Sequence, residues 1–431
     1  MKGAILFVAS AAILLLAGGF PLRHPVARVV GRLPGAVVVG AVWLHLVLTL
    51  ASFLGLRWTA GLLAFATLSG WFGCRLWTGR SRGISAPGDP DSRIGWGLVA
   101  GSIPIAWFGF LSAVHLAHTP DFVYHWGLKA KQWVAAGGID ESFLSRPGAW
   151  RMHPDYPQLV TELGALPGLL SGQFDERAAL LQAAAVAWLT LLVVRRSLSA
   201  AGVAGFALEA WTVVVGAALG GFGAAHGMAG GADGFVAFGI AVAMTGILRP
   251  TPSGAGLAAT GLGAAFAAGS KIEGIPIAAI LLVAAAWRGR AQHRGFRSSV
   301  LAALPAGLVV AAWWWGARDV LLPTNAGRLR FEIIPEVLAG FARSAMSLDG
   351  GFFPILLLTL PWIARDRKLR LAATVVSAVV ALYLLLYLIS PVGGALLVHL
   401  SAQRLLSQVT PTLLLILATR CTAFPHEHSG E

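Results

Sequence analysis

Long apolar stretches separated by short polar connectors repeat along almost the whole chain. A helix needs about 20 mainly apolar residues to cross about 30 Å of hydrocarbon, and stretches of this kind recur throughout. Runs such as residues 372–389 are apolar on every face and lack the strict alternation of a membrane-spanning β-strand. The pattern therefore predicts an all-α fold, a polytopic transmembrane helical bundle.

The apolar stretches have unequal lengths, which limits how well the number of spans can be predicted. The candidates are residues 4–20, 36–55, 59–77, 95–117, 178–194, 203–222, 234–248, 255–269, 274–287, 300–316, 351–364, 371–390 and 396–419. Three of them are short, so we expect about 11 to 13 spans. The first resembles a secretory signal peptide, but further spans follow at once, and we expect it to be retained.

Composition and charge agree with this arrangement. The chain is 57% hydrophobic and 12% charged, with a formal net charge of +13. Its Lys and Arg residues lie in short connectors, as the positive-inside rule requires, so we do not expect a nucleic-acid partner. Connectors 21–35, 78–94, 195–202, 249–254, 288–299 and 365–370, with the tail, hold 18 of them, whereas the short connectors of opposite parity hold only Lys2, Arg57 and Lys271.

This alternation predicts the side on which each loop lies. The long hydrophilic segments 118–177 and 317–350 belong to the outer, periplasmic side, where their length exempts them from the charge rule. Cys74 and Cys421 lie near predicted cytoplasmic ends of spans, which argues against a disulfide framework or a cysteine metal site. We therefore look for chemistry in the two outer segments and in the span ends beside them.

Segment 121–133, DFVYHWGLKAKQW, is typical of an amphipathic helix on the membrane surface. Helical spacing places Asp121 and His125 on one face with Leu128 or Lys129. A carboxylate at a partly dehydrated interface can accept a proton from a hydroxyl, and Lys129 and Lys131 can hold phosphate. The alternative is a helix capped by Asp121, with lysines that extend to the water.

The next polar stretch is RMHPDYPQL, residues 151–159, in which Arg151, His153, Asp155 and Tyr156 surround two prolines. A rigid loop of polar and aromatic side chains is suited to contacts with a sugar or a phosphate. A His and an Asp two residues apart are a poor metal signature, and proline turns are common in any loop.

Three further polar positions lie at predicted span ends. Asp233 follows a glycine-rich connector, Lys271 and Glu273 share a very short one, and His399 and Arg404 enter the last span. Ionisable residues at such depths mark candidate functional sites, and Arg404 needs an anionic partner such as a phosphate. The alternatives are helix capping by Asp233, mutual neutralisation of the Lys271 and Glu273 charges, and pairing of Arg404 with a buried carboxylate.

In this order, these stretches resemble the bacterial GT-C glycosyltransferases related to protein O-mannosyltransferases and aminoarabinose transferases. Those enzymes have an Asp in the first large periplasmic loop, a W-x-x-KA helix (here WGLKAK), a His-Pro-x-Tyr-Pro turn (here HPDYP), and elements like YADLP (here GGADGF) and TKNEG (here SKIEG). A late His and Arg before a Pro-containing span complete the series. GGADGF lacks the Tyr and Pro of the family pattern, and Ile272 replaces an Asn that is common there.

The resemblance implies an inverting transfer of a sugar from a polyprenyl-phosphate carrier to an envelope lipid, glycan or protein at the outer face of a bacterial cytoplasmic membrane. Residues 1–94 would form accessory helices, residues 95–419 the catalytic domain and residues 420–431 a cytoplasmic tail. Asp121 would be the catalytic carboxylate. The groups expected to bind the phosphate or sugar, or to orient those that do, are His125, Lys129, Lys131, Arg151, His153, Asp155, Tyr156, Asp233, Lys271, Glu273, His399 and Arg404.

Other functions remain open at this point. Some relatives use a divalent metal, although the sequence assigns no metal ligand and shows no nucleotide-binding motif. A transporter or flippase would line its path with intramembrane charges, but here they cluster on one side and no internal repeat is evident. A ligase or polymerase of lipid-linked oligosaccharides would also need outer Arg and His residues.

Overall fold

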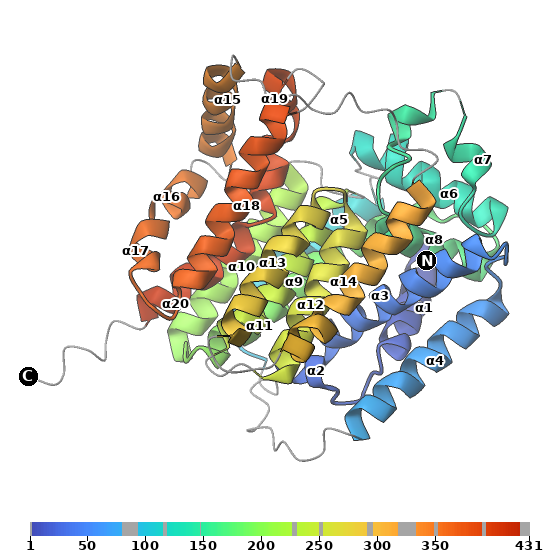
Figure 1. Ribbon diagram of the computed structural model, residues 1–431, viewed down its shortest axis with the longest axis horizontal. Helices are drawn as coiled ribbons and strands as arrows, with labels where there is room; N and C mark the ends of the chain where they lie inside the picture. The colour runs from blue at the N-terminus through green and yellow to red at the C-terminus, as the bar shows by residue number, and fades with distance from the viewer. Residues whose placement is uncertain are drawn as a thin grey trace, which may run out of the picture.

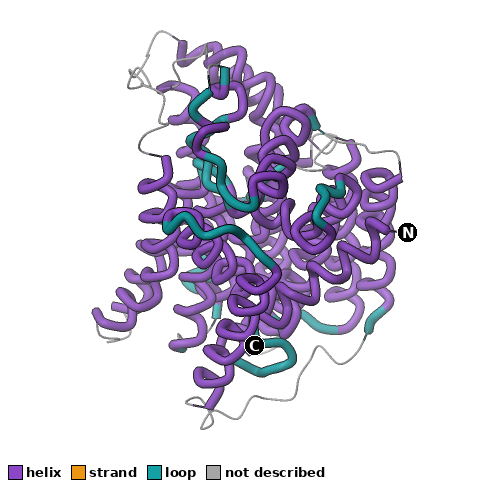
Figure 2. Tube along the Cα trace, turned by 90° about the vertical axis from the view of Figure 1, so that its right-hand side faces the viewer, coloured by secondary structure: helices purple, strands orange, loops and turns teal. Residues whose placement is uncertain are grey.

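The computed structural model describes residues 2–79, 94–114, 119–146, 148–225, 231–249, 253–290, 296–317, 333–348, 352–389 and 394–422. All regular elements within these ranges are helices, joined mostly by short loops (Figures 1 and 2). The predicted all-α fold is therefore confirmed. Most of connector 78–94, residues 318–332 of the second long loop and residues 423–431 of the tail lie outside the described residues.

The helices fall into three groups along the chain. The first comprises α1 (Lys2–Ala17), α2 (Pro25–Val30), α3 (Arg32–Phe53), α4 (Ala60–Gly79) and α5 (Trp96–Val114). The first long loop holds η2 (Phe122–Trp126), α6 (Gly127–Ala136), α7 (Glu141–Leu144), η3 (Ala149–Met152) and α8 (Leu159–Ser171). The remainder are α9 (Glu176–Ala200), α10 (Gly205–Ala225), α11 (Asp233–Leu248), α12 (Gly254–Ser270), α13 (Gly274–Arg290), α14 (Phe296–Ala317), α15 (Ile334–Ser347), α16 (Phe352–Leu358), α17 (Leu360–Ala364), α18 (Arg370–Ile389), α19 (Gly394–Ser407) and α20 (Thr410–Thr422).

Each of the thirteen predicted stretches overlaps a helix, but fewer helices are long enough to cross a membrane alone. Among the described residues, α3, α5, α9, α18 and residues 297–316 of α14 are long and apolar enough, and two bent helix pairs raise the number from five to seven. Helices such as α11 and α12 have 16 and 17 residues. At about 1.5 Å per residue they reach about 24–26 Å, which is less than about 30 Å of hydrocarbon.

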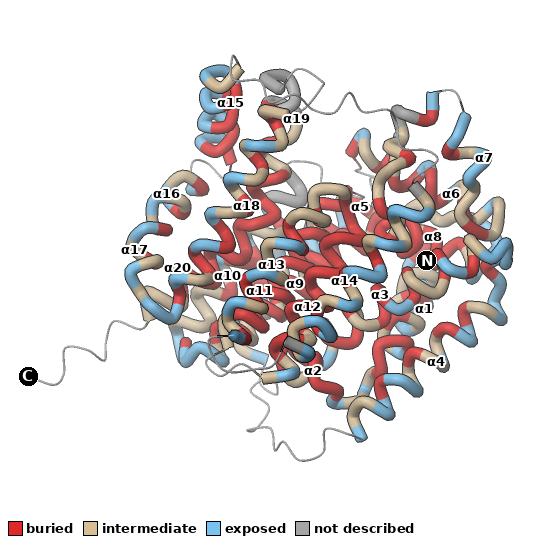
Figure 3. Tube along the Cα trace, in the orientation of Figure 1, coloured by how far each residue is buried: buried red, intermediate tan, exposed pale blue. Residues whose placement is uncertain are grey.

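The centre of the bundle is formed by α11 and α12, which approach closely because small residues line their contact. A Cβ atom at Gly239 would lie 2.7 Å from the carbonyl oxygen of Gly263, and one at Gly263 would lie 2.5 Å from that of Gly239. Small residues at such crossings let helix backbones pack directly, as in membrane helix pairs. Nearly all of α11 is buried, in contrast to the outer helices (Figure 3).

The outer helices expose large apolar side chains. Phe65, Leu68 and Phe72 on α4 and Ile103 and Trp107 on α5 are all more than half exposed. Apolar surface of this extent is unfavourable in water and favourable in hydrocarbon. The structure is thus a helical bundle whose outer surface is suited to a membrane.

The two ends of α11 differ in their polar contacts. At its carboxyl end, Arg249 donates to the carbonyl oxygens of Arg28 and Val29, Arg196 donates to the same two carbonyls, and Arg288 donates to that of Arg249. We call Arg28, Arg196, Arg249 and Arg288 the arginine end. These residues come from connectors that the charge pattern assigns to one side, and the structure brings them together.

The first long loop differs from its prediction in one respect. It contains α8, a 13-residue apolar helix that is mostly buried against α1, α3, α6 and α9. The apolar stretches predicted from the sequence do not include residues 159–171, which we placed in a hydrophilic outer segment of amphipathic helices and loops. The length of α8 is too short for a span, and Pro167 and Glu162 interrupt its apolar character, so the pattern of the sequence does not separate it from the loop.

Candidate active site

The side chain of Asp233 joins segments that lie far apart in the sequence. It is fully buried in the first turn of α11, at the opposite end from Arg249. Oδ2 accepts from Nε and Nη2 of Arg404 at 2.9 and 2.7 Å, and Oδ1 accepts from Nζ of Lys271 at 3.0 Å and from Nε2 of Gln408 at 2.6 Å. A buried carboxylate is tolerated when it is paired and hydrogen-bonded in this way.

Asp121 lies in the same group of residues. Its Oδ2 accepts from Nη2 of Arg404, so that one guanidinium bridges Asp121 and Asp233. The side chain of Asp121 is 22% exposed, whereas that of Asp233 is not exposed at all. Of the two carboxylates, Asp121 is therefore the one that an incoming molecule can contact.

Lys271 adds a second cation. It follows α12, donates to Asp233 and forms an ion pair with Glu273, whose Oε1 is 3.3 Å from its Nζ. Oε2 of Glu273 is buried and has no hydrogen-bond partner among the described residues. We refer to Asp121, Asp233, Lys271, Glu273, Arg404 and Gln408 as the Asp233 cluster, and to the end of the bundle that holds it as the polar end.

The HPDYP turn, residues 153–157, lies beside this cluster. The ring of His153 is 4.6 Å from that of His125 and 4.4 Å from that of Tyr156, measured between centroids. Nε2 of His125 is in turn 3.9 Å from Oδ1 of Asp121. Trp313 of α14 donates to the carbonyl oxygen of Asp155 and so ties the turn to the bundle.

Burial keeps the two histidines neutral near pH 7. Burial, together with the neighbouring charges of His125 and Lys129, lowers the pKa of His153 to about 4. Burial also lowers the pKa of His125, against the effect of Asp121. A neutral imidazole can donate one hydrogen bond and accept another. Near Asp121, the histidines can therefore orient a hydroxyl without adding charge.

Lys129 lies beneath the HPDYP turn. It is fully buried, its Nζ donates to the carbonyl oxygen of His153 at 3.3 Å, and it lies 4.8 Å from the centre of the Trp126 ring. Burial lowers the pKa of this ammonium to about 7, although Asp155 acts in the other direction. In this structure Lys129 therefore supports the turn, whereas Lys131, two residues on, is exposed.

The remaining predicted residues are less closely connected to the cluster. Burial raises the pKa of Asp155, and so does nearby Glu273, while its Oδ1 has no hydrogen-bond partner among the described residues. Arg151 lies in η3 and His399 in α19, but their side chains are outside the described residues. Within the described ranges, no three His, Cys, Asp or Glu side chains are grouped closely enough to hold a metal ion.

Two groups of polar residues were missed by the sequence analysis. Gln408 lies between α19 and α20, where its Oε1 accepts from the hydroxyl of Tyr383 at 2.6 Å. The second group is His45 of α3 with Glu162 of α8, whose Nδ1 and Oε2 atoms are 2.7 Å apart. A polar residue inside an apolar stretch was the available signal for both Gln408 and His45.

The Asp233 cluster can bind an anion beside a carboxylate. No described residue accepts a hydrogen bond from Nη1 of Arg404, and this side chain is 19% exposed. A guanidinium suits phosphate oxygens because its donors lie in a fixed plane.

In comparisons with models of protein families, with curated proteins and with solved structures, the chain matches none of them.

Proposed function

We propose that this chain is a GT-C-type inverting glycosyltransferase that moves a sugar from a polyprenyl-phosphate carrier to an envelope acceptor. The bridge that Arg404 forms between Asp121 and Asp233 is the observation that carries the proposal. It places the partly exposed carboxylate of Asp121 next to the guanidinium of Arg404, which the buried carboxylate of Asp233 holds in place. An acid–base group beside an anion-binding cation is what the transfer of a phosphate-linked sugar needs.

Each charged residue has a distinct part in the proposed reaction. The acceptor oxygen attacks the anomeric carbon and the bond from that carbon to the phosphate oxygen breaks, which inverts the configuration. The proton of the acceptor hydroxyl passes to Asp121, and the electron pair of the broken bond leaves with the polyprenyl phosphate. Arg404 and Lys271 stabilise the negative charge that develops on this phosphate.

Asp233 is a positioning residue in this mechanism. Its carboxylate oxygens accept from Lys271, Arg404 and Gln408, and it has no exposed surface with which to contact a sugar. It holds Arg404 and Lys271 in place, as second-layer carboxylates often do for groups that bind a ligand. A phosphate oxygen that takes the Nη2 donor of Arg404 would leave the Asp121 oxygen free to accept the hydroxyl proton.

The proposed setting is the outer face of a bacterial cytoplasmic membrane. The contacts of the arginine end support this orientation, because cytoplasmic connectors are rich in arginine. The exposed apolar side chains of α4 and α5 would face lipid, through which a polyprenyl chain can approach.

The proposal is tested by analysing the envelope glycans and glycolipids of a deletion strain. We expect one sugar to disappear in this strain and to return with the wild-type gene. Asp121→Asn should accumulate in the membrane without restoring the sugar, because loss of general-base catalysis costs about 10²- to 10⁴-fold in rate.

Asp175→Asn is the matched control. Asp175 caps α9 by accepting from the backbone N–H of Ala178, and Asn caps helices equally well. This variant should restore the sugar fully. Full restoration by Asp121→Asn would remove that residue from the mechanism, and an unchanged envelope in the deletion strain would end the proposal.

A further inference from the structure

A second buried polar site lies away from the Asp233 cluster, where α3 meets α8. Nδ1 of His45 is 2.7 Å from Oε2 of Glu162, and Thr49 donates to Oε1 of the same carboxylate at 2.8 Å. All three side chains are buried. Ionisable residues at such a depth in an apolar helix are costly, so their presence is a reason to look for a ligand.

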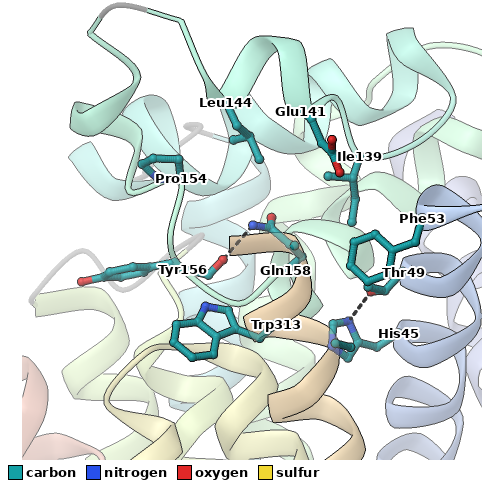
Figure 4. Close-up of a pocket in the computed structure, with 12 residues that line it drawn as sticks. His45, Thr49, Phe53, Ile139, Glu141, Leu144, Pro154, Tyr156, Gln158 and Trp313 are labelled. Carbon is teal, nitrogen blue, oxygen red and sulfur yellow. Dashed lines mark hydrogen bonds between the residues drawn. The ribbon is translucent and has the colours of Figure 1, made fainter. Parts of the chain in front are cut away.

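A small cavity borders this site, and Figure 4 shows the residues around it. Its walls are mainly apolar and aromatic, with His45 and Thr49 on one side and Gln158 at the centre. The volume of about 30 Å³ is roughly twice the 10–15 Å³ that one water molecule needs. The cavity therefore fits a group of about two heavy atoms, such as the hydroxymethyl arm of a larger molecule.

Two polar atoms of the wall form no hydrogen bond with the part of the chain that the structure describes. Nε2 of His45 and Oε1 of Gln158 are both buried, and no described residue forms a hydrogen bond with either. The amide oxygen needs a donor, since Nε2 of Gln158 already donates to the carbonyl oxygen of Tyr156 at 2.7 Å. The imidazole atom needs an acceptor or a donor, depending on its protonation. When Nε2 of His45 carries a proton, a hydroxyl satisfies both atoms, because it accepts from Nε2 and donates to Oε1 of Gln158, whereas an ammonium only donates and a carboxylate only accepts.

The cavity shares a wall with the candidate active site. Pro154 and Tyr156 of the HPDYP turn line the cavity, while His153 of the same turn contacts His125 beside Asp121. A molecule that contacts Asp121 with one hydroxyl and extends past this turn would place another part of itself in the cavity. Contacts with such non-reacting parts supply binding energy that aligns the reacting group.

We propose that this cavity is a subsite for the acceptor, which takes a hydroxymethyl group of a sugar or polyol unit that does not itself react. The inference rests on the proposed function and adds the chemistry of the acceptor to it. The apolar walls contact the methylene group, and His45 and Gln158 bind the hydroxyl.

Two changes test the subsite by different means. His45→Asn keeps a polar amide group where Nδ1 faces Glu162 but removes the atom at Nε2. Ala312→Leu, at a lining position on α14, fills the cavity without removing a polar group. The matched controls are His24→Asn, a buried histidine that caps α2, and Ala311→Leu, the exposed neighbour on α14.

Each variant is expressed in the deletion strain, and the restored envelope sugar is measured. Binding of undecaprenyl phosphate to the purified full-length chain is measured separately, as the rise in its thermal unfolding midpoint. We expect His45→Asn and Ala312→Leu to lower the restored sugar about tenfold, since one buried hydrogen bond is worth about that factor. Binding of undecaprenyl phosphate should stay within about twofold of the wild type, and both controls should behave as the wild type.

The outcomes separate this inference from the proposed function. Normal restoration by either cavity variant would mean that the cavity holds water only, and loss of undecaprenyl phosphate binding in them would mean a role in folding. Either result overturns the subsite and leaves the role of Asp121 intact. If Asp121→Asn restores the sugar, the proposed function itself fails, whatever the cavity variants do.

Discussion

The two ends of α11 hold their cations in different ways. At the arginine end, Arg196 and Arg249 donate to backbone carbonyls. At the polar end, Arg404 and Lys271 donate to carboxylate side chains. A hydrogen bond to a backbone carbonyl oxygen holds a loop in place and leaves the charge of the cation uncompensated, whereas a carboxylate neutralises the charge of the cation. A phosphate can take over a cation from a partly exposed carboxylate, so of the two ends the polar end is the one that fits the proposed binding of a phosphate.

The largest effect that would test this comparison is expected from Asp233→Asn. The substitution leaves the buried Arg404 and Lys271 without their shared carboxylate, and breaking a buried ion pair costs about 3–5 kcal/mol. We therefore expect a much lower thermal unfolding midpoint in detergent micelles and no restored sugar. Asp121→Asn is the comparison variant, because a partly exposed pair contributes about 1 kcal/mol or less. Equal midpoints for the two variants would contradict the distinction between anchor and exchangeable carboxylate.

Lys129 is the exception at the polar end, since its Nζ donates to a carbonyl oxygen, and pH can test it. Burial lowers its pKa from the ordinary 10.5 to about 7, so between these values the unfolded chain holds the extra proton. The unfolding free energy of the wild type should then rise with pH across this window. The Lys129→Met variant has no ammonium to bury, so its unfolding free energy should not rise in this way. The amount by which its unfolding free energy exceeds that of the wild type should therefore decrease from pH 7 to pH 10. The exposed Lys131→Met is the control, and parallel pH profiles for Lys129→Met and wild type would refute the buried ammonium.

The smallest effect is expected at the arginine end. Arg249→Gln removes at least one of the bonds to the carbonyls of Arg28 and Val29, each worth about 1 kcal/mol. The unfolding midpoint should fall slightly, and the restored sugar should equal that of the wild type. A loss of sugar without a loss of folded protein would mean that this end also serves the reaction.

The repeating apolar stretches predicted thirteen segments, each of which overlaps a helix, and the order of the polar stretches predicted which residues to examine. Helical spacing and connector charge placed Asp121, Asp233, Lys271 and Arg404 at one end, and the structure joins these four in one network. The contact of Arg404 with Asp233 also agrees with the alternative that we kept open, in which Arg404 pairs with a buried carboxylate. These features could be predicted because the length of an apolar helix and the charges at its ends can be read directly from the sequence.

Other features depend on packing that the sequence does not display. Periodicity places Lys129 on a face of its helix but does not indicate whether that face meets solvent or the HPDYP turn. His45 finds its partner Glu162 at a separation of 117 residues, through a short helix hidden in a long loop. This pairing depends on how α3 packs against α8. The residues around His45 and Glu162 in the sequence do not indicate that these two helices are neighbours.

The contacts of Asp233 also have a consequence for biogenesis. Arg404 follows Asp233 by 171 residues, and Gln408 by 175, so the carboxylate is synthesised long before these two partners. Until α19 is inserted, Asp233 depends on Lys271 or on water that reaches the half-assembled bundle. A chain released by the ribosome before α19 would thus hold Asp233 with Lys271 alone, without the guanidinium and the amide that complete its hydrogen bonds.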